Sequence, residues 1–290
     1  MNSQIRQEVV MKRVIACIDS SPCINALADA AAWVATKTGR ELVLLQVLDY
    51  YPASYHLGEI SGVIGFESNA MLLKELAELE HKQSELALDY SNNLLTHISS
   101  TIKEKYNLDV QRIQEKGDFI EQGTQLLHPD DIVLMGRLGE RSAEKNKPLG
   151  TNVENFIRSA NCTVMTVGDT FTPPTRFIFA YEFSPTCTKM MHRIAQSDLL
   201  RQLQCHILYV GDHNEVLKQA ADYLQEAGLD VVSVARYGDV AHHILNYQEE
   251  TDIQLIVLGA FSHSKLHQFF LGSIATSIFR NSKVPLLVAK

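Results

Sequence analysis

Two loops of this sequence combine glycines with a hydroxyl-bearing residue in a pattern that could bind phosphate. The first has the spacing G-x2-G-x10-G-T and comprises Gly136, Gly139, Gly150 and Thr151. The second has the spacing G-x2-S-x9-G-S and comprises Gly259, Ser262, Gly272 and Ser273. A glycine at a strand end lets the backbone approach a ligand, and N–H groups at the next helix N-terminus donate hydrogen bonds to anions. Because the arrangement occurs twice, after equivalent apolar runs, we predict phosphate binding.

An acidic residue accompanies each loop. Asp19 and Glu182 each end an apolar run that precedes a helical pattern. In a doubly wound sheet ordered 3-2-1-4-5, ligands bind beyond the carboxyl ends of strands one and four, where the order reverses. Asp19 would then lie near Gly136, and Glu182 near Gly259. A carboxylate opposite a phosphate loop suits a ribose hydroxyl or an adenine amine. The alternative for Asp19 is a cap on the helix that follows it.

The same order of segments occurs twice along the chain. The stretch "RVIACIDS" at 13–20 matches "RFIFAYEF" at 176–183, and "DIVLMGRLG" at 131–139 matches "QLIVLGAFS" at 254–262. A proline-containing stretch, "GDTFTPPTR", separates the two copies. We therefore predict a first domain over 11–168, a linker over 169–175 and a second domain over 176–290.

Each copy alternates short apolar runs with helical patterns of ten or more residues. The run 132–135 is apolar throughout and 253–258 is apolar except for Gln254, as expected for parallel strands covered on both faces. The pattern over 24–38 predicts a helix that ends at Gly39. The alternation predicts two doubly wound α/β units with right-handed crossovers.

The first copy carries an insertion of about 50–106 that the second copy lacks. Within it, 67–105 reads as one long amphipathic helix with leucines near helical spacing. One interpretation is a surface arm that packs on its own domain. The other is a contact between copies of the chain or a cover over the binding site.

The composition of the chain argues against several classes of protein. The chain has 290 residues, a net charge of −8 and no long basic run, so nucleic acids and anionic membranes are poor candidate partners. Its five cysteines are odd in number and none has CxxC spacing, which argues against a disulfide framework or a structural zinc site. No apolar run is long enough for a membrane span, and no signal peptide is apparent, so we expect a cytoplasmic protein.

Two histidines in the second loop are candidate metal ligands. His263 and His267 are four residues apart, with Lys265 between them. Two histidines without a nearby carboxylate or cysteine are too few for a specific zinc site, so we predict no metal site. The pair His242 and His243 begins a helical pattern and lacks a Ser or Cys nucleophile in a recognisable arrangement, so we predict no catalytic residue.

Several motifs together resemble a tandem universal stress protein. They are "ACIDSS", "LLQVLD", "EKGD", "IVLMG" and "LGT" in the first copy, and "YVGD", "RYGD", "IVLGAFSHS", "LGS" and "KVPLLVA" in the second. The resemblance covers most of the chain. It implies two flavodoxin-like domains paired as a pseudo-dimer through the last strands, 163–167 and 284–288. It also implies a role in stress survival and binding of ATP or a related adenine nucleotide, with Mg²⁺ as a candidate companion ion.

The resemblance adds a valine of the second strand, whose backbone meets adenine, to each site. The first candidate site is Asp19, Val47, Gly136, Gly139, Gly150 and Thr151. The second is Glu182, Val210, Gly259, Gly272 and Ser273, with Ser262 where the motif has glycine. The first copy has one extra loop residue, which can bulge outward. In the second copy, Ser262 replaces a glycine, and serine would cost free energy if the backbone there needs positive φ. Glu182 is also longer than the aspartate of the motif, so the sequence favours the first site.

Three functions remain open at this point. The first is a regulatory protein that binds an adenine nucleotide in one or both domains, with a homodimer of the tandem chain as a further possibility. The second is a nucleotide-free pseudo-dimer that acts as an interaction scaffold. The third is a weak ATPase, since Mg²⁺ and bound phosphates can suffice for slow hydrolysis. Enzymes that cleave ATP between the α and β phosphates need the motif S-G-G-x-D-S, and 16–21 lack both glycines.

Overall fold

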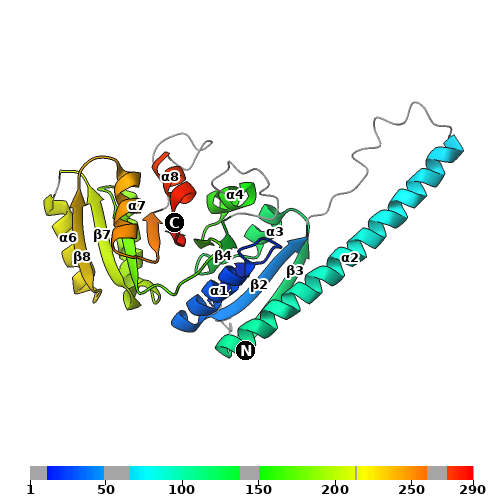
Figure 1. Cartoon of the computed structure of the whole chain (residues 1–290), viewed down its shortest axis with the longest axis horizontal. Helices are drawn as coiled ribbons and strands as arrows, with labels where there is room; N and C mark the ends of the chain where they lie inside the picture. The colour runs from blue at the N-terminus through cyan, green and yellow to red at the C-terminus, as the bar shows by residue number, and fades with distance from the viewer. Residues whose placement is uncertain (1–11, 49–65, 138–149, 213, 260–272, 290) are drawn as a thin grey trace, which may run out of the picture.

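A single mixed sheet organises the protein. The computed structural model describes residues 12–48, 66–137, 150–212, 214–259 and 273–289. Its ten strands lie in the order β3-β2-β1-β4-β5-β10-β9-β6-β7-β8 (Figure 1). They are β1 (Arg13–Cys17), β2 (Glu41–Leu48), β3 (Val110–Lys116), β4 (Ile132–Gly136), β5 (Thr163–Val167), β6 (Arg176–Tyr181), β7 (Gln204–Val210), β8 (Val231–Arg236), β9 (Ile256–Gly259) and β10 (Leu286–Ala289). We call β1–β5 the first half-sheet and β6–β10 the second half-sheet.

Each half-sheet has the strand order 3-2-1-4-5 predicted from the sequence, and its strands are parallel. The two halves meet at β5 and β10, which pair antiparallel with Leu286 opposite Thr166 and Val288 opposite Val164. The predicted pseudo-dimer pairing through the last strands is therefore confirmed. Strand β10 begins at Leu286, two residues later than the sequence pattern indicated.

Helices cover both faces of the sheet. They are α1 (Ile24–Thr38), α2 (Phe66–Tyr106), α3 (Phe119–Gln125), α4 (Thr151–Ser159), α5 (Pro185–Gln196), the 3-10 turn η2 (Leu200–Gln202), α6 (Asn214–Glu226), α7 (Val240–Glu250) and α8 (Ser273–Asn281). Helix α1 has the predicted bounds. Its alanine-rich sequence favours a helix, and Gly39 ends it with φ 64°, a left-handed conformation that suits glycine.

Two apolar cores lie on opposite faces of the sheet, and each spans both half-sheets. Side chains from α1, α2, α5 and α6 join one core, while those from α4, α7 and α8 join the other. Successive residues of β1 alternate between them, with Val14 on one side and Ile15 on the other. Val14 and Ile15 are both almost fully buried, as expected for a parallel strand covered on both faces.

The inserted helix α2 is 41 residues long, and among its described side chains only those near its end are buried against the sheet. Leu95, Ile98 and Ile102 are buried against the first half-sheet. One turn earlier, the hydroxyl of the buried Ser91 donates to Gln46 and accepts from Gln114. The beginning of the helix extends away from the sheet (Figure 1). The long helix predicted over 67–105 is confirmed, and its last part does pack on its own half-sheet.

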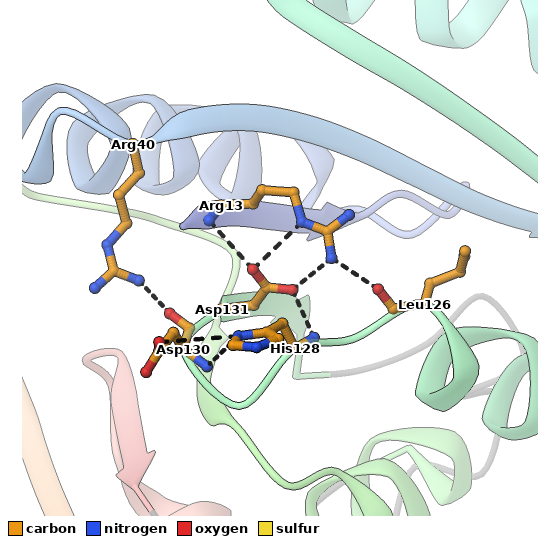
Figure 2. A network of polar contacts seen from close by, with 6 residues as sticks. All are labelled: Arg13, Arg40, Leu126, His128, Asp130 and Asp131. Atoms are coloured by element: carbon orange, nitrogen blue, oxygen red, sulfur yellow. Dashed lines mark hydrogen bonds and ion pairs between the residues drawn. The ribbon is translucent and has the colours of Figure 1, made fainter. Parts of the chain in front are cut away.

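An ion pair holds together the amino ends of β1 and β4. The Arg13 guanidinium donates to Asp131 Oδ2 at 2.6 Å, and the carboxylate also accepts from the backbone N–H groups of Arg13 and His128 (Figure 2). The Asp131 side chain is fully buried. Arg13 Nη2 also donates to the Leu126 carbonyl at 2.7 Å. The pair thereby connects the turn before β4 to the first strand.

A buried histidine lies in β7 of the second half-sheet. The Nδ1 atom of His206 bonds the Tyr247 hydroxyl at 2.8 Å, and its Nε2 bonds Gln204 Oε1 at 2.9 Å. The pKa of His206 is lowered, first because burial disfavours the imidazolium and second because Arg176 lies nearby, with Asp230 opposing the shift. The folded state therefore favours neutral His206.

Acidification is expected to destabilise the protein in part through this residue. The unfolded chain takes up a proton below about pH 6.5, whereas folded His206 resists it, so stability is lost as the pH falls through the unfolded pKa. We expect the unfolding midpoint temperature to fall less between about pH 7.5 and about pH 5.5 in His206→Gln than in the unsubstituted protein. Thermal melts at the two pH values measure this. Equal drops in both proteins would contradict the prediction.

Candidate functional site

A cavity of about 350 Å³ lies beyond the carboxyl ends of the strands in the second half-sheet. Its walls come from the ends of β6, β7 and β9 and from the beginnings of α5, α7 and α8. Strands β6 and β9 are neighbours, and the strand order reverses between them. The cavity therefore occupies the crevice in which doubly wound sheets bind ligands. Its size is within the usual range for small-molecule sites.

Four residues of the second candidate site line this cavity: Glu182, Val210, Gly259 and Ser273. They come from four different segments that the fold brings together. Apolar side chains form much of the remaining wall, among them Leu208, Ile244 and Leu258. The other two members of this predicted site, Ser262 and Gly272, lie outside the described residues.

Glu182 follows β6 directly and is exposed at the edge of the cavity. Its carboxylate accepts a hydrogen bond from the Ser184 hydroxyl at 3.0 Å, which restricts the side chain near the end of the strand. The same hydroxyl oxygen accepts from the Cys187 N–H at 3.2 Å and so caps helix α5. The acid is thus positioned by the first turn of the next helix and keeps acceptor capacity for a ligand.

Gly259 ends β9 and brings backbone close to the α5 side of the cavity. A Cβ atom added there would be 3.8 Å from Met190 Cβ and 3.9 Å from Thr186 Cγ2, which is ordinary contact. A larger side chain would extend beyond that contact into the space beside the cavity. On the other wall, Ser273 begins helix α8, so its hydroxyl and the first N–H groups of the helix lie at the same region.

Cys187 is a cavity residue that sequence reasoning missed. The sequence pattern indicates only a small buried apolar residue, and Cys187 is buried, but it also lines the cavity. Burial raises the pKa of its thiol to about 11, and the charge of Glu182 contributes to the shift. At neutral pH the thiol stays protonated and is a poor nucleophile. Its position in the first turn of the helix after the acid is the signal that could have identified it.

The first half-sheet brings its described candidate residues to the corresponding edge. Asp19 lies two residues beyond β1, Val47 is half-buried in β2, and Gly136 is the buried last residue of β4. Strands β1 and β4 pair with Cys17 opposite Met135, so Asp19 and Gly136 follow adjacent strands. Whether this edge binds a ligand stays a prediction.

Gly150 precedes α4, which begins at Thr151, and the Gly150 N–H donates to the Arg137 carbonyl at 3.1 Å. The ends of the first glycine loop are thus held together, while Gly139 lies outside the described residues. Asp19 does not cap α1, so that alternative interpretation is wrong. Its Oδ1 accepts from the Ser21 N–H at 3.1 Å, and α1 begins later, after Cys23.

Arg137, the residue after Gly136, reaches the second half-sheet instead of facing a ligand in the first. Its guanidinium donates to the carbonyls of Ser282 and Val284, the second at 2.6 Å. Those carbonyls belong to the turn between α8 and β10. Burial lowers the pKa of Arg137, and the charge of Asp169 partly opposes this. The start of the first glycine loop is therefore fixed to the second half-sheet.

The histidines considered as metal ligands fall into two groups. His263, His267 and Lys265 lie outside the described residues. His242 and His243 are in the first turn of α7, where the His242 N–H is capped by Asp239 and His243 Nε2 bonds the Tyr237 carbonyl at 2.7 Å. Over the described ranges, no group of three or more metal-binding side chains gathers. No helix in those ranges is long and apolar enough to cross a membrane.

Comparison with known proteins gives consistent results for sequence and fold. The model of the universal stress protein family matches residues 212–290. Universal stress protein Slr1230 of Synechocystis is 29% identical over 284 residues, which cover 96% of this chain and 99% of that protein. Universal stress protein YxiE of Bacillus subtilis is 31% identical over 97 residues and is covered over 66% of its length.

Solved structures agree along the whole chain. The crystal structure of a universal stress protein from Archaeoglobus fulgidus superposes with a TM-score of 0.68 at 18% identity, covering 96% of both chains. That of a putative universal stress protein from Pseudomonas aeruginosa gives a TM-score of 0.58 at 15% identity, covering 97% of this chain and 94% of the other. At these identities the likeness concerns the fold.

Proposed function

We propose that this chain, which belongs to the universal stress protein family, binds an adenine nucleotide in the cavity of its second half-sheet. The observation that carries the proposal is the composition of that cavity. An acid, Glu182, stands at its edge after β6, Gly259 ends the neighbouring strand β9, and the beginning of α8 forms another part of the wall. The sequence favours the first site, but the described cavity is lined by four of the six residues predicted for the second.

The lining suits the parts of a nucleotide. Leu208, Val210 and Ile244 offer an apolar surface of the kind that accepts an adenine ring. Glu182 can accept from a ribose hydroxyl or the adenine amine. Ser273 and the first N–H groups of α8 can donate to phosphate oxygens, and Mg²⁺ bound to those phosphates would supply charge neutralisation there.

A regulatory role fits this cavity better than a catalytic one. The thiol of Cys187 has a raised pKa, so it stays protonated at neutral pH and is a poor nucleophile. Binding would instead select among conformations or partners of the protein, in keeping with the stress-survival role that the family resemblance implies. Slow hydrolysis of ATP is the lesser alternative, and release of phosphate during prolonged incubation would reveal it.

A nucleotide-free interaction scaffold is the second candidate. It is favoured by three large apolar side chains that are exposed on the second half-sheet's carboxyl edge. Phe183 is 72% exposed, Tyr237 is 61% exposed and Ile274 is 44% exposed. Exposed apolar side chains at one edge can mark a protein contact. Ser262 and Glu182, which depart from the family motif, point in the same direction.

Mass spectrometry of small molecules released from denatured, freshly purified protein tests the two candidates. We expect an adenine nucleotide near one equivalent, or a thermal stabilisation by millimolar Mg-ATP that millimolar Mg-GTP does not match. A saturating ligand at about 100 times its Kd contributes about 2.7 kcal/mol, a shift of several degrees. If no nucleotide is released and Mg-ATP causes no thermal shift, the result favours the scaffold.

A further inference from the structure

The beginning of α2 presents an apolar stripe to solvent. Among the described side chains from Lys74 to Tyr90, none is buried. Yet Leu79 is 58% exposed, Leu86 is 62% exposed and Tyr90 is 57% exposed. These are three of the six large apolar side chains exposed in the described part of the protein. The part of α2 that carries this stripe projects from the body (Figure 1). An exposed apolar stripe of this kind marks a surface for contact with another protein segment.

The stripe has coiled-coil spacing. Counting Leu76 as heptad position a places Leu79 and Leu86 at d and Gln83 and Tyr90 at a. The seam formed by these five positions is thus apolar except for Gln83, and Leu76 is partly exposed. A strict a/d pattern of this kind is typical of a helix that pairs with another helix, rather than of one that packs on a sheet.

The seam does not coincide with the face that packs on the sheet. Ser91, Leu95 and Ile98 form that face. At about 100° per residue, the seam lies roughly 100° around the helix from it. Asn93 and His97, the next d and a positions, are both exposed where the helix runs along the sheet. A second helix could therefore follow the seam from the projecting part onto the packed part without meeting the sheet.

Contacts among the described residues contribute little to the stability of the projecting part of α2. The two ion pairs on this stretch, Lys74 with Glu78 at 4.0 Å and His81 with Glu85 at 3.6 Å, are exposed. Exposed pairs of this kind add little to the stability of a helix. Isolated helical segments of this length are marginally stable in water. Most of the stability of the projecting part must come from a contact along the seam.

We propose that the seam binds the same seam of a second copy of the chain, with the two helices antiparallel. This arrangement places Leu79 opposite the partner's Tyr90 and Gln83 opposite the partner's Leu86. Lys82, at heptad position g, then faces the partner's Asp89, and the two-fold symmetry repeats that ion pair. A parallel pairing would instead place Lys82 opposite the partner's Ala87, which is uncharged. Charge complementarity therefore selects the antiparallel second copy.

Sedimentation equilibrium of the full chain over a range of concentrations tests the proposal. We expect a reversible dimer that Leu86→Lys converts to monomer. Lys82→Glu should weaken the dimer roughly tenfold by turning two attractive pairs into repulsive ones. Combining Lys82→Glu with Asp89→Lys should restore it. Lys74→Glu makes the same charge change outside the seam and should leave the dimerisation constant unchanged.

Leu86 is mostly exposed, so its replacement should leave the fold intact, and circular dichroism checks this for every variant. Three results would overturn the proposal. They are a monomer at all concentrations, a dimer that survives Leu86→Lys, and a dimer that Lys82→Glu weakens but Asp89→Lys does not rescue. The last would exclude the antiparallel register specifically. None of them bears on nucleotide binding, which is measured separately in the second half-sheet.

Discussion

Replacing Asp131 with alanine is expected to lower the free energy of unfolding by about 3–5 kcal/mol. The Asp131 side chain is fully buried and accepts from the Arg13 guanidinium and from two backbone N–H groups. Removing the carboxylate leaves the Arg13 charge without its partner and two partly buried donors unsatisfied. Such a loss is large compared with the total stability of most domains. Urea denaturation followed by circular dichroism measures it.

The repeated architecture provides the matched control. Gln254 occupies the corresponding place in the second half-sheet, where its Oε1 accepts from the Thr175 N–H at 3.1 Å and from the Thr175 hydroxyl. Both hydrogen bonds are exposed, so Gln254→Ala should cost at most about 1 kcal/mol. A similar loss in the two variants would show that the buried ion pair of the first half-sheet contributes no more than an exposed hydrogen bond.

Gly259→Val is expected to weaken binding of an adenine nucleotide roughly 10- to 100-fold. The first added carbon makes ordinary contact with Thr186 and Cys187, and the two further methyl groups must occupy space that a ligand would use. The methyl groups would clash with the ligand and not with the fold, and a loss of about 1.4–2.8 kcal/mol of binding free energy corresponds to that factor in Kd. Isothermal titration with Mg-ATP measures the change. The unfolding midpoint should move little, because Gly259 has no backbone conformation that requires glycine.

Gly136→Val is the companion variant in the first half-sheet. If the second cavity is the binding site, this variant should retain the affinity of the unsubstituted protein. Loss of binding in Gly136→Val with retention in Gly259→Val would instead assign the ligand to the first half-sheet. Loss in neither would place the nucleotide elsewhere and refute both candidate sites.

Local sequence patterns predicted the elements whose limits depend on neighbouring residues. Helix α1 begins and ends where its alanines and Gly39 indicated, because propensity and a left-handed end residue act within a few positions. The order of strands followed from the alternation of elements and was confirmed. The pairing of β5 with β10 came from family resemblance, since no local pattern specifies which strands join two repeats.

Features that depend on tertiary contacts were less predictable. The mostly apolar run 253–258 forms a strand only from Ile256, because the Ile253 N–H closes helix α7 by donating to the Gln248 carbonyl. The part played by Cys187 could not be read from its type, since a buried thiol looks alike in a core and in a cavity wall. Arg137 has no distinguishing pattern in the sequence, and only the three-dimensional structure shows that it bonds across the two halves.

The antiparallel junction of β5 and β10 has a geometric consequence for the two candidate sites. Strands of the first half-sheet point one way and those of the second point the other way, so their carboxyl ends emerge on opposite edges of the shared sheet. Occupants of the two crevices would therefore be separated by the length of the strands and could not touch. Any communication between them must pass through the protein, and a macromolecule that contacts one crevice leaves the other accessible.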